Sequence, residues 1–423
     1  MRRLTAATAA AALGLAVAAC SPPAEENENG GEDNGTGSGP QAGTSVTVGW
    51  NQPFYSYNSD TSNGNATANA IILYMMNSGF NYYNPDLELV PDESFGTYEK
   101  TSDDPLTVTY TVNEGVSWSD GTAVDAADML LYWAALSGNR NTVDAGSVER
   151  DPDTNVPVEG QGVYFDTSSP GLAFVTETPE ISEDGRALTL VYDEPFADWE
   201  TAFGVGVPAH VTAGEALGIE DAQEAKDALI EAVQNEDEES LSSIANFWNS
   251  GYDYSSLPDN EKLYLSSGAY LMEDFVENQY ITLKANPDYT GDLAAQIETV
   301  TVRWNEDPLA QAQSLANGEI DLFGPQATTD VLQAVEAIDG VELESGVEGT
   351  YEHVDLTYDN GGPFDPKSYG GDEEKAKAVR LAFLKSIPRQ EILDKLIVPL
   401  QSDAELRNSF NLTPGAPGYD EMV

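Results

Sequence analysis

Apolar and polar side chains recur along this chain with two periods, one typical of strands and the other of helices. The clearest alternation is Leu106–Val112, where apolar residues and threonines take turns as in a strand with one buried face. The clearest helical period is Asp221–Asn235, whose apolar side chains recur every four residues. We therefore expect both strands and helices in the body of the chain.

The same patterns predict further elements on both sides of these two segments. The other predicted strands are Ser45–Trp50, Leu188–Tyr192, Gly268–Phe275, Gln279–Ala285, Thr299–Trp304, Glu319–Phe323 and Tyr351–Tyr358. The other predicted helices are Ala66–Ser78, Met129–Leu136 with Asp125 as its N-cap, Pro308–Ala316, Asp330–Ile338 and Asp372–Ser386. Strands and helices that mix without a strict repeat indicate an α/β or α+β architecture.

The N-terminus has the pattern of a targeting segment. Two arginines after Met1 precede an uncharged, Ala-rich run that is shorter than the ~20 residues needed to span a bilayer. The run ends in Val17-Ala18-Ala19-Cys20, which resembles a bacterial lipobox, and Cys20 is the only cysteine of the chain. We predict that residues 1–19 are a signal peptide and that Cys20 carries lipid. The alternative is an ordinary cleavage site with an incidental cysteine.

Residues 20–45 are rich in Glu, Asn, Gly, Ser and Pro and contain no aromatic side chain. Such a composition cannot bury a core, so we expect a disordered tether behind the lipid. A flexible coil of this length spans roughly 28 Å. This would hold a globular body just off a membrane surface.

Charge and composition exclude several classes of protein. The chain has 423 residues, which suggests two or three domains, and its formal net charge is −55. That charge argues against binding of nucleic acid or of anionic lipid headgroups. One cysteine and two histidines, His210 and His353, leave no basis for a disulfide framework or a multi-His zinc site. The acidity fits either a saline habitat or simple solubility.

Catalytic and metal-binding motifs are weak. No nucleophile elbow, phosphate-binding loop or zinc-protease motif occurs. We expect His210 to lie in a turn or at a domain edge and His353 to be a structural residue within a strand. Asp151-x-Asp153-x-Asn155 supplies the first ligands of a calcium loop but lacks its later Gly and Glu, so a solvated acidic loop is the alternative.

Aromatic residues gather at and after the first predicted strand. The loop Trp50–Asn58 holds several rings among polar residues, next to a strand end where ligands often bind. Such rings could equally be packing, and the sequence leaves both interpretations open. As candidate ligand contacts we select Trp50, Asn51 and Tyr55.

Several separated segments together resemble one family, the extracellular solute-binding proteins of the peptide/nickel class that serve ABC importers. The most characteristic segment is Asn113–Asp128, with its Trp-Ser-Asp-Gly-Thr turn before a helix. The other matching segments, in the family's order, are Val207–Val211, Ser267–Leu271, Ile281–Tyr289, Leu315–Asp321, Gly362–Asp365 and Val379–Phe383. Two segments depart from the family pattern: Ile387-Pro388-Arg389 stands where Ile-Asp-Arg is usual, and residues 139–162 do not align.

This resemblance implies an α/β, two-lobed periplasmic-binding-protein-like fold with mixed sheets. We expect lobe I to consist of residues 46–66 and 188–325, with a subdomain at 67–187. Residues 326–423 would form part of lobe II. In the family that lobe is longer and the chain then returns to lobe I, so we expect lobe II to be incomplete, without the acidic residue that commonly grips a peptide's amino group.

The resemblance also implies a function. It indicates a lipid-anchored binding protein at the outer face of the cytoplasmic membrane that captures an oligopeptide-like solute and delivers it to ABC permease subunits. Nickel, heme-like cargo and sugars are alternative ligands within the family, and Ser267 joins the candidate contacts by alignment. We expect a monomer without catalytic residues, cofactor or metal. The alternatives are an interaction or signalling role on the same fold and, less favoured, a secreted hydrolase.

Overall fold

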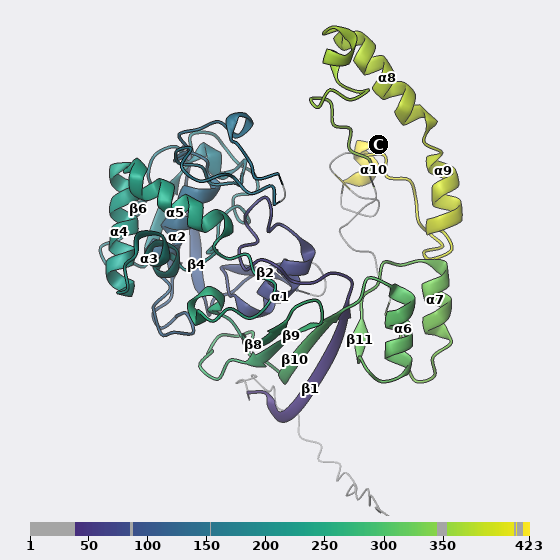
Figure 1. Ribbon diagram of the computed structural model, residues 1–423, viewed down its shortest axis with the longest axis horizontal. Helices are drawn as coiled ribbons and strands as arrows, with labels where there is room; N and C mark the ends of the chain where they lie inside the picture. Colours follow the sequence, from purple (N-terminus) through teal and green to yellow (C-terminus); the bar gives the residue numbers. More distant parts are fainter. Residues whose placement is uncertain (1–38, 85–87, 153, 345–352, 410–411, 413–417) are drawn as a thin grey trace, which may run out of the picture. The chain divides into compact units, whose positions relative to one another are not determined.

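Two β-sheets form the framework of the protein in the computed structural model (Figure 1). The structure describes residues 39–84, 88–152, 154–344, 353–409, 412 and 418–423. The predicted signal peptide and Cys20 lie outside these residues, as does most of the predicted tether. Residues 39–423 group into one unit by their contacts, so the lobe boundaries at 66, 187 and 325 remain predictions.

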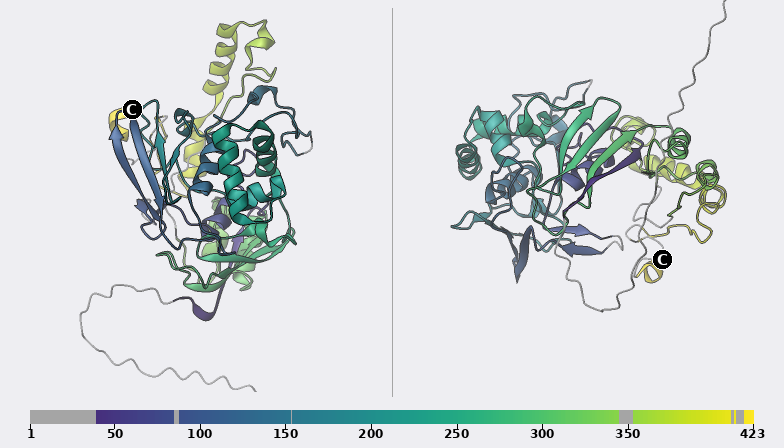
Figure 2. Two further views of the ribbon diagram at one scale, coloured as in Figure 1. Left: turned by 90° about the vertical axis from the view of Figure 1, so that its left-hand side faces the viewer. Right: turned by 90° about the horizontal axis from the view of Figure 1, so that it is seen from below.

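The five-stranded sheet joins the first strand of the chain to much later ones, in the order β11-β1-β10-β9-β8. Its strands are β1 Gln41–Trp50, β8 Tyr270–Val276, β9 Tyr280–Ala285, β10 Ile297–Trp304 and β11 Leu322–Phe323. β1 runs parallel to both of its neighbours, β10 and β11, whereas β8, β9 and β10 pair antiparallel. Figure 2 shows β1 beside β10 from below. The mixed sheet of the prediction is therefore confirmed.

The second sheet has four antiparallel strands in the order β4-β5-β7-β6, and a separate hairpin pairs β2 with β3. These strands are β2 Asn81–Tyr83, β3 Leu89–Pro91, β4 Gly96–Asp103, β5 Leu106–Val112, β6 Glu180–Ile181 and β7 Ala187–Val191. The alternation predicted for β5 is present, because Leu106, Val108, Tyr110 and Val112 are buried while the threonines between them are partly exposed. One face of this sheet thus belongs to the core.

The helices are distributed along the whole described chain. They are α1 Thr67–Met76, α2 Ala126–Leu136, α3 Ala209–Leu217, α4 Ala222–Asn235, α5 Glu238–Ser250, α6 Pro308–Ala316, α7 Thr329–Glu336, α8 Glu373–Ser386, α9 Arg389–Ile392 and α10 Tyr419–Met422. Short 3₁₀ turns occupy Ala145–Ser147, Leu172–Phe174, Glu261–Tyr264 and Pro366–Tyr369, and a π-helical turn occupies Leu393–Ile397. The described residues contain no helix long and apolar enough to cross a membrane.

Helix α2 lies in the main core and is the point where several elements meet. All of its residues except Tyr132 are buried, which agrees with its apolar composition on every side. Asp125 caps the helix by accepting from the Ala127 N–H at 2.9 Å, and Asp128 accepts from the Asp125 N–H at 2.9 Å. This capping box confirms the predicted helix start.

The family-like segment around Trp118 ties α2 to α3 and α4. Asp128 also accepts from the Trp118 indole N–H at 3.2 Å and from the Ala209 N–H at the start of α3 at 2.8 Å. Lys226 of α4 is buried against Asp125 at 3.0 Å and Asp128 at 3.2 Å. The segment therefore joins α2, α3 and α4, and we call this cluster of Trp118, Asp125, Asp128 and Lys226 the junction. These structural contacts are enough to explain the residue pattern of the segment.

Two predicted strands differ from the structure. Tyr351–Tyr358 is wrong as a strand over its described part, because residues 353–358 have no regular structure and the apolar side chains Val354 and Tyr358 are exposed instead of buried on one face. Glu319–Phe323 is a strand only at Leu322–Phe323, since Gly318 ends α6 with a positive φ and the chain needs residues 319–321 to turn. Strand β1, in contrast, begins at Gln41, inside the segment expected to be a tether.

Candidate functional site

The parallel strands β1, β10 and β11 end together at one edge of the five-stranded sheet. Trp50, the last residue of β1, lies opposite Trp304, the last residue of β10. Phe323 of β11 pairs with Gly49 on the other side of β1. In sheets with parallel strands, ligands often bind outside the carboxyl ends of those strands. We take this edge as the candidate functional site.

Both tryptophans of this edge carry indole N–H groups without an acceptor. The rings are partly buried against the main core, and neither Nε1 atom has a hydrogen-bond partner among the described residues. Tryptophan N–H groups usually find a partner when buried, and a donor left without one costs about 1–3 kcal/mol. Both Nε1 atoms are themselves buried, so only a small rearrangement of the rings or an internal water would give these donors an acceptor.

Backbone contacts hold this edge in place. The Trp50 carbonyl accepts from the Asn305 N–H at 2.9 Å and from Gln311 Nε2 of α6 at 3.0 Å. Gly324, directly after β11, lies so close that a Cβ there would be 3.6 Å from the Trp50 ring. The ring thus borders the segment through which the chain continues to α7.

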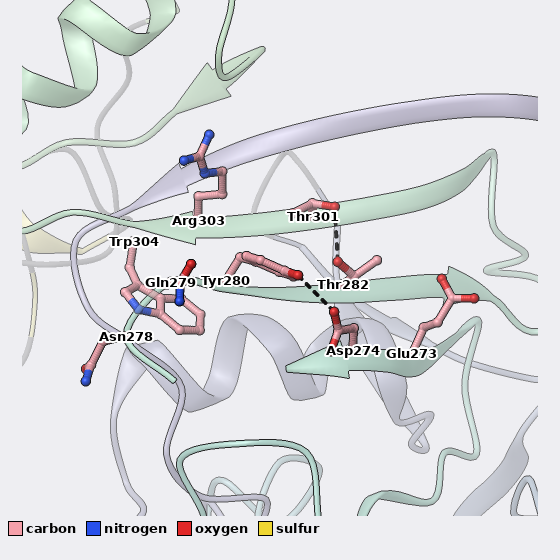
Figure 3. Close-up of a pocket in the computed structure, with 9 residues that line it drawn as sticks. All are labelled: Glu273, Asp274, Asn278, Gln279, Tyr280, Thr282, Thr301, Arg303 and Trp304. Carbon is pink, nitrogen blue, oxygen red and sulfur yellow. Dashed lines mark hydrogen bonds between the residues drawn. The ribbon is translucent and has the colours of Figure 1, made fainter. Parts of the chain in front are cut away.

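A groove opens on the sheet face beside Trp304 (Figure 3). It measures about 890 Å³ and is lined by side chains of β8, β9, β10 and the turn between β8 and β9, most of them polar. Tyr280 donates to Asp274 at 2.9 Å, and the hydroxyls of Thr282 and Thr301 lie 3.3 Å apart. The hydrogen bond to Asp274 raises the pKa of the Tyr280 phenol, so this ring remains a neutral donor at physiological pH. Together with Arg303, these groups give the groove both hydrogen-bond donors and hydrogen-bond acceptors.

The other candidate contacts of the sequence are distributed over different places. Asn51 is partly exposed and follows Trp50 directly. Tyr55 is held inside its own loop, because its hydroxyl donates to the Asn63 carbonyl at 2.7 Å and its N–H donates to Asn69 Oδ1 at 2.9 Å. Ser267 is 5% exposed, and it precedes β8 at the end of the sheet opposite to Trp50. The structure brings together Trp50 and Asn51 but not Ser267.

Most of the remaining rings in the loop after β1 are packing. Phe54 and Tyr57 are each 2% exposed, and Phe54 packs against Phe275 and Tyr254 with ring centres 5.7 and 5.8 Å apart. Tyr57 donates to Asn77 Oδ1 at 3.1 Å. For these two residues the packing interpretation describes the structure.

The predicted turn at His210 and the predicted strand at His353 are wrong, whereas a domain edge at His210 stays a prediction. His210 is not in a turn but in the first turn of helix α3, where it is 4% exposed and its Nε2 lies 3.0 Å from Asp120 Oδ2. Burial raises the pKa of Asp120, but hydrogen bonds from His210 and Thr122 outweigh this effect and lower that pKa to about 2. His353, expected inside a strand, lies in an irregular segment with its Nε2 3.1 Å from Asp355.

The acidic segment with the first ligands of a calcium loop forms a turn in its described residues. Asp151 Oδ1 accepts from the Thr154 N–H at 2.8 Å, and Asn155 adopts a positive φ. Asp153 lies outside the described residues. Within the ranges that the structure describes, no group of three His, Cys, Asp or Glu side chains is arranged to hold a metal ion.

Trp304 is the residue of this edge that the sequence prediction did not select. The signal was present, since Trp304 ends a predicted strand just as Trp50 does. Its importance depends on the parallel register of β1 and β10, which brings together residues 254 positions apart. Which strands pair, and in which register, cannot be predicted from the alternation pattern of each strand alone.

Comparison with known proteins gives a family match over most of the chain. Residues 94–422 match the model of the bacterial extracellular solute-binding proteins, family 5. An uncharacterized lipoprotein of Mycobacterium leprae is 29% identical over 252 residues, which cover 59% of this chain and 40% of that protein. The oligopeptide-binding protein OppA of Mycobacterium tuberculosis is 24% identical over 342 residues, 80% of this chain and 46% of that protein.

A solved structure with a similar fold is that of a periplasmic EDTA-binding protein, EppA. It has a TM-score of 0.54 and 25% identity, over 71% of this chain and 47% of that one. The chain thus spans less than half the length of these curated relatives and of this structural neighbour.

Proposed function

Because the chain belongs to the family 5 bacterial extracellular solute-binding proteins, we propose that it captures a solute outside the cytoplasmic membrane and delivers it to an ABC permease. The family consists of binding proteins rather than enzymes. The observation that carries the proposal is the family match over residues 94–422. In this proposal the edge formed by Trp50 and Trp304 would be the wall against which the solute lies.

We propose an oligopeptide-like solute. A relative of this chain is named an oligopeptide-binding protein, and the polar groups of the groove beside Trp304 suit the N–H and carbonyl groups of a peptide backbone. The EDTA-binding neighbour suggests a different class, a polyanionic chelate. A formal net charge of −55 repels such a ligand over long range and favours a neutral or cationic one.

Within the proposed site, Trp50 and Asn51 would contact the solute directly. Trp304 lies opposite Trp50 and would complete an aromatic surface, which costs little conformational entropy when a ligand orders it. Tyr55 and Ser267 remain candidate contacts, although each hydroxyl already has a partner within the protein. The Tyr55 hydroxyl donates to the Asn63 carbonyl at 2.7 Å, and the Ser267 hydroxyl accepts from the Ser78 N–H at 3.2 Å.

Replacing Trp50 with alanine is the test of this site. The solute is first identified by mass spectrometry of material that purifies with the protein, and its Kd is then measured by calorimetry. We expect Trp50→Ala to weaken binding by about 1–3 kcal/mol, the range of an interface hot spot. Because Trp50 also packs against the core, Trp50→Phe serves as a second variant that keeps an aromatic ring and most of the apolar contact.

The matched control for this test is Tyr83→Ala. Tyr83 is an aromatic residue that is 57% exposed on the β2–β3 hairpin, and its loss should leave the Kd unchanged. If Trp50→Ala and Trp50→Phe both retain wild-type affinity while unfolding more easily, Trp50 is a core residue and the proposed site is wrong.

Lipid anchoring through Cys20 is a separate prediction. A curated relative is named a lipoprotein, and the only cysteine of this chain follows the Ala-rich N-terminal run. In a bacterial host, a labelled fatty acid should be incorporated into the wild-type protein and not into Cys20→Ala. Loss of the anchor should also release the protein from the membrane fraction, since acyl chains contribute ~0.8 kcal/mol per buried CH₂. Equal labelling of the two proteins would contradict the assignment.

A further inference from the structure

A second cavity, of about 320 Å³, lies between helix α1, the loop Tyr57–Asp60 and residues 204–207. It shares no lining residue with the groove beside Trp304. Tyr74 of α1 is part of its lining and is 62% exposed, whereas Asp92 and Val207, also in its lining, are each 3% exposed. The cavity therefore reaches from the surface to buried residues, and its volume is in the range of small-molecule sites.

Asp92 brings an unused acceptor to this cavity. Its Oδ1 accepts from the N–H groups of Ser94 at 3.0 Å and Phe95 at 3.2 Å. Its Oδ2 is buried and has no hydrogen-bond partner among the described residues. Buried carboxylate oxygens are nearly always paired, so this oxygen indicates a missing donor or cation.

Asp60 brings a second carboxylate to the same cavity. Its N–H donates to Asn58 Oδ1 at 3.2 Å, and Asn58 Nδ2 donates to the Trp248 carbonyl at 2.8 Å, which fixes the loop. In the part of the chain that the structure describes, no cation or hydrogen-bond donor pairs with the Asp60 carboxylate, and burial raises its pKa to about 6. Gly206 leaves room for it, since a Cβ there would approach Asp60 Oδ2 to 2.7 Å.

Aromatic rings complete the lining. The phenol-bearing residues of the cavity are Tyr57, Tyr74, Tyr82 and Tyr132. Carboxylates together with aromatic rings recognise organic cations, because the carboxylates neutralise the charge and the ring faces attract the ammonium group and its alkyl carbons. A bare metal ion fits less well, since Ca²⁺ takes 6–8 oxygen ligands and two carboxylates supply few of them.

From this arrangement we infer that the cavity binds a small alkylammonium cation, with its charged ends at Asp60 and Asp92 and its carbon chain against the tyrosine rings. This site is separate from the Trp50 edge, so a test of it does not depend on the proposed transport function. It adds a cation-binding activity to the protein.

The probe for this site is putrescine, a four-carbon diammonium ion, tested by calorimetry near pH 8. Two probes of the same carbon chain serve as controls: 1,4-butanediol, which is neutral, and succinate, which is a dianion. We expect saturable binding of putrescine alone. Asp60→Asn and Asp92→Asn should each weaken it about tenfold or more, the loss expected for a charge-assisted hydrogen bond. Both variants keep the size of the side chain and, at position 92, the Oδ1 acceptor, so both should fold.

The variant Asp227→Asn tests whether putrescine is attracted by the acidic surface in general and not by the cavity. Asp227 is exposed on α4 and its replacement removes the same charge outside the cavity, so putrescine affinity should stay at the wild-type value. Binding should also fall as the pH decreases from ~8 to ~5, because Asp60 takes up a proton around pH 6. The other titratable groups facing the cavity are Asp92 and the four phenols.

Three results would overturn the inference. They are the absence of saturable putrescine binding, equal binding of 1,4-butanediol, and an affinity of Asp60→Asn or Asp92→Asn that equals that of Asp227→Asn. Loss of putrescine binding with intact binding of the peptide-like solute would leave the proposed function untouched. Loss of binding of the peptide-like solute with intact putrescine binding would contradict the proposed function and leave the cation site supported.

Discussion

Lys226→Met should lower the free energy of unfolding by about 3–5 kcal/mol, the cost of breaking a buried ion pair by removing one partner. The Lys226 side chain is 2% exposed and lies 3.0 Å from Asp125 and 3.2 Å from Asp128. Its ammonium also donates to the Ala123 carbonyl at 2.6 Å. Methionine fills a similar volume but leaves two neighbouring carboxylates without their cation.

Charge balance explains why this lysine remains protonated in the core. Burial by itself lowers the pKa of Lys226, but the charges of Asp128 and Asp125 outweigh burial and raise that pKa above its ordinary value. Lys226 is therefore a fixed cation at every physiological pH. Its contribution to stability is present below pH ~10 as long as its aspartate partners are ionised, and it is lost as the pH rises through the raised pKa of Lys226. It also weakens at acid pH, because burial raises the pKa of Asp125 and this carboxylate then takes up a proton.

Urea unfolding of Lys226→Met and of a surface control measures this effect. Lys284→Met is the control, because Lys284 pairs with Glu273 at 3.3 Å while both side chains are about half exposed. That pair should contribute at most about 1 kcal/mol. Adding Asp125→Asn to Lys226→Met should recover part of the loss, since it removes one of the two unbalanced charges. Equal losses for Lys226→Met and Lys284→Met would show that the junction is not a buried charge cluster.

The junction also shows what a sequence pattern can and cannot reveal. The prediction of Asp125 as the N-cap of α2 is confirmed, because cap chemistry is local and depends on residues only three apart. Lys226 lies 98 positions from Asp128, and nothing in its own amphipathic helix distinguishes it from an exposed lysine. The cap at Asp125 was therefore predictable from the sequence, whereas the contact of Lys226 with the two aspartates was not.

Elements with a strong period were predicted within a few residues, and weak ones were missed. β5 has a buried and an exposed face, and its predicted bounds agree with the structure. β4, Gly96–Asp103, was not predicted because it is an edge strand with mostly exposed polar side chains. Helix α5, Glu238–Ser250, was missed because its serines and two asparagines weaken the helical signal, although Asp237 caps it.

The same limit applies to the candidate sites. Trp50 could be selected because an aromatic residue at a strand end is visible in the sequence. Asp60 and Asp92 could not be selected among 73 acidic residues, because what distinguishes them is the burial of a carboxylate without a partner. Burial depends on the packing of α1 against distant segments, and a single sequence carries no direct record of it.

Amide exchange should be at least about 100-fold faster in α8 than in α2, because exchange protection follows the free energy of local opening. In α2 ten residues are buried in the main core, whereas in α8 only Ala376 is buried. Leu381, Phe383 and Leu384 of α8 are each 41–49% exposed. An isolated helix of this length is marginal in water, so α8 gains little protection without packing of its apolar residues.

Helices α6 and α7 provide the internal reference for this exchange experiment. They form a small core of Ala312, Val331 and Val335, and we expect protection between that of α2 and α8. The contacts of α8 are local: Phe383 packs on Phe364 with ring centres 5.3 Å apart, and Arg380 donates to the Phe364 carbonyl at 2.8 Å. If α8 exchanges as slowly as α2, its apolar residues must be covered in solution by a surface that these contacts do not include. Fast exchange that slows when solute is added would instead couple ordering of α8 to binding, because a ligand that binds only the ordered form stabilises it in proportion to ln(1 + [L]/Kd).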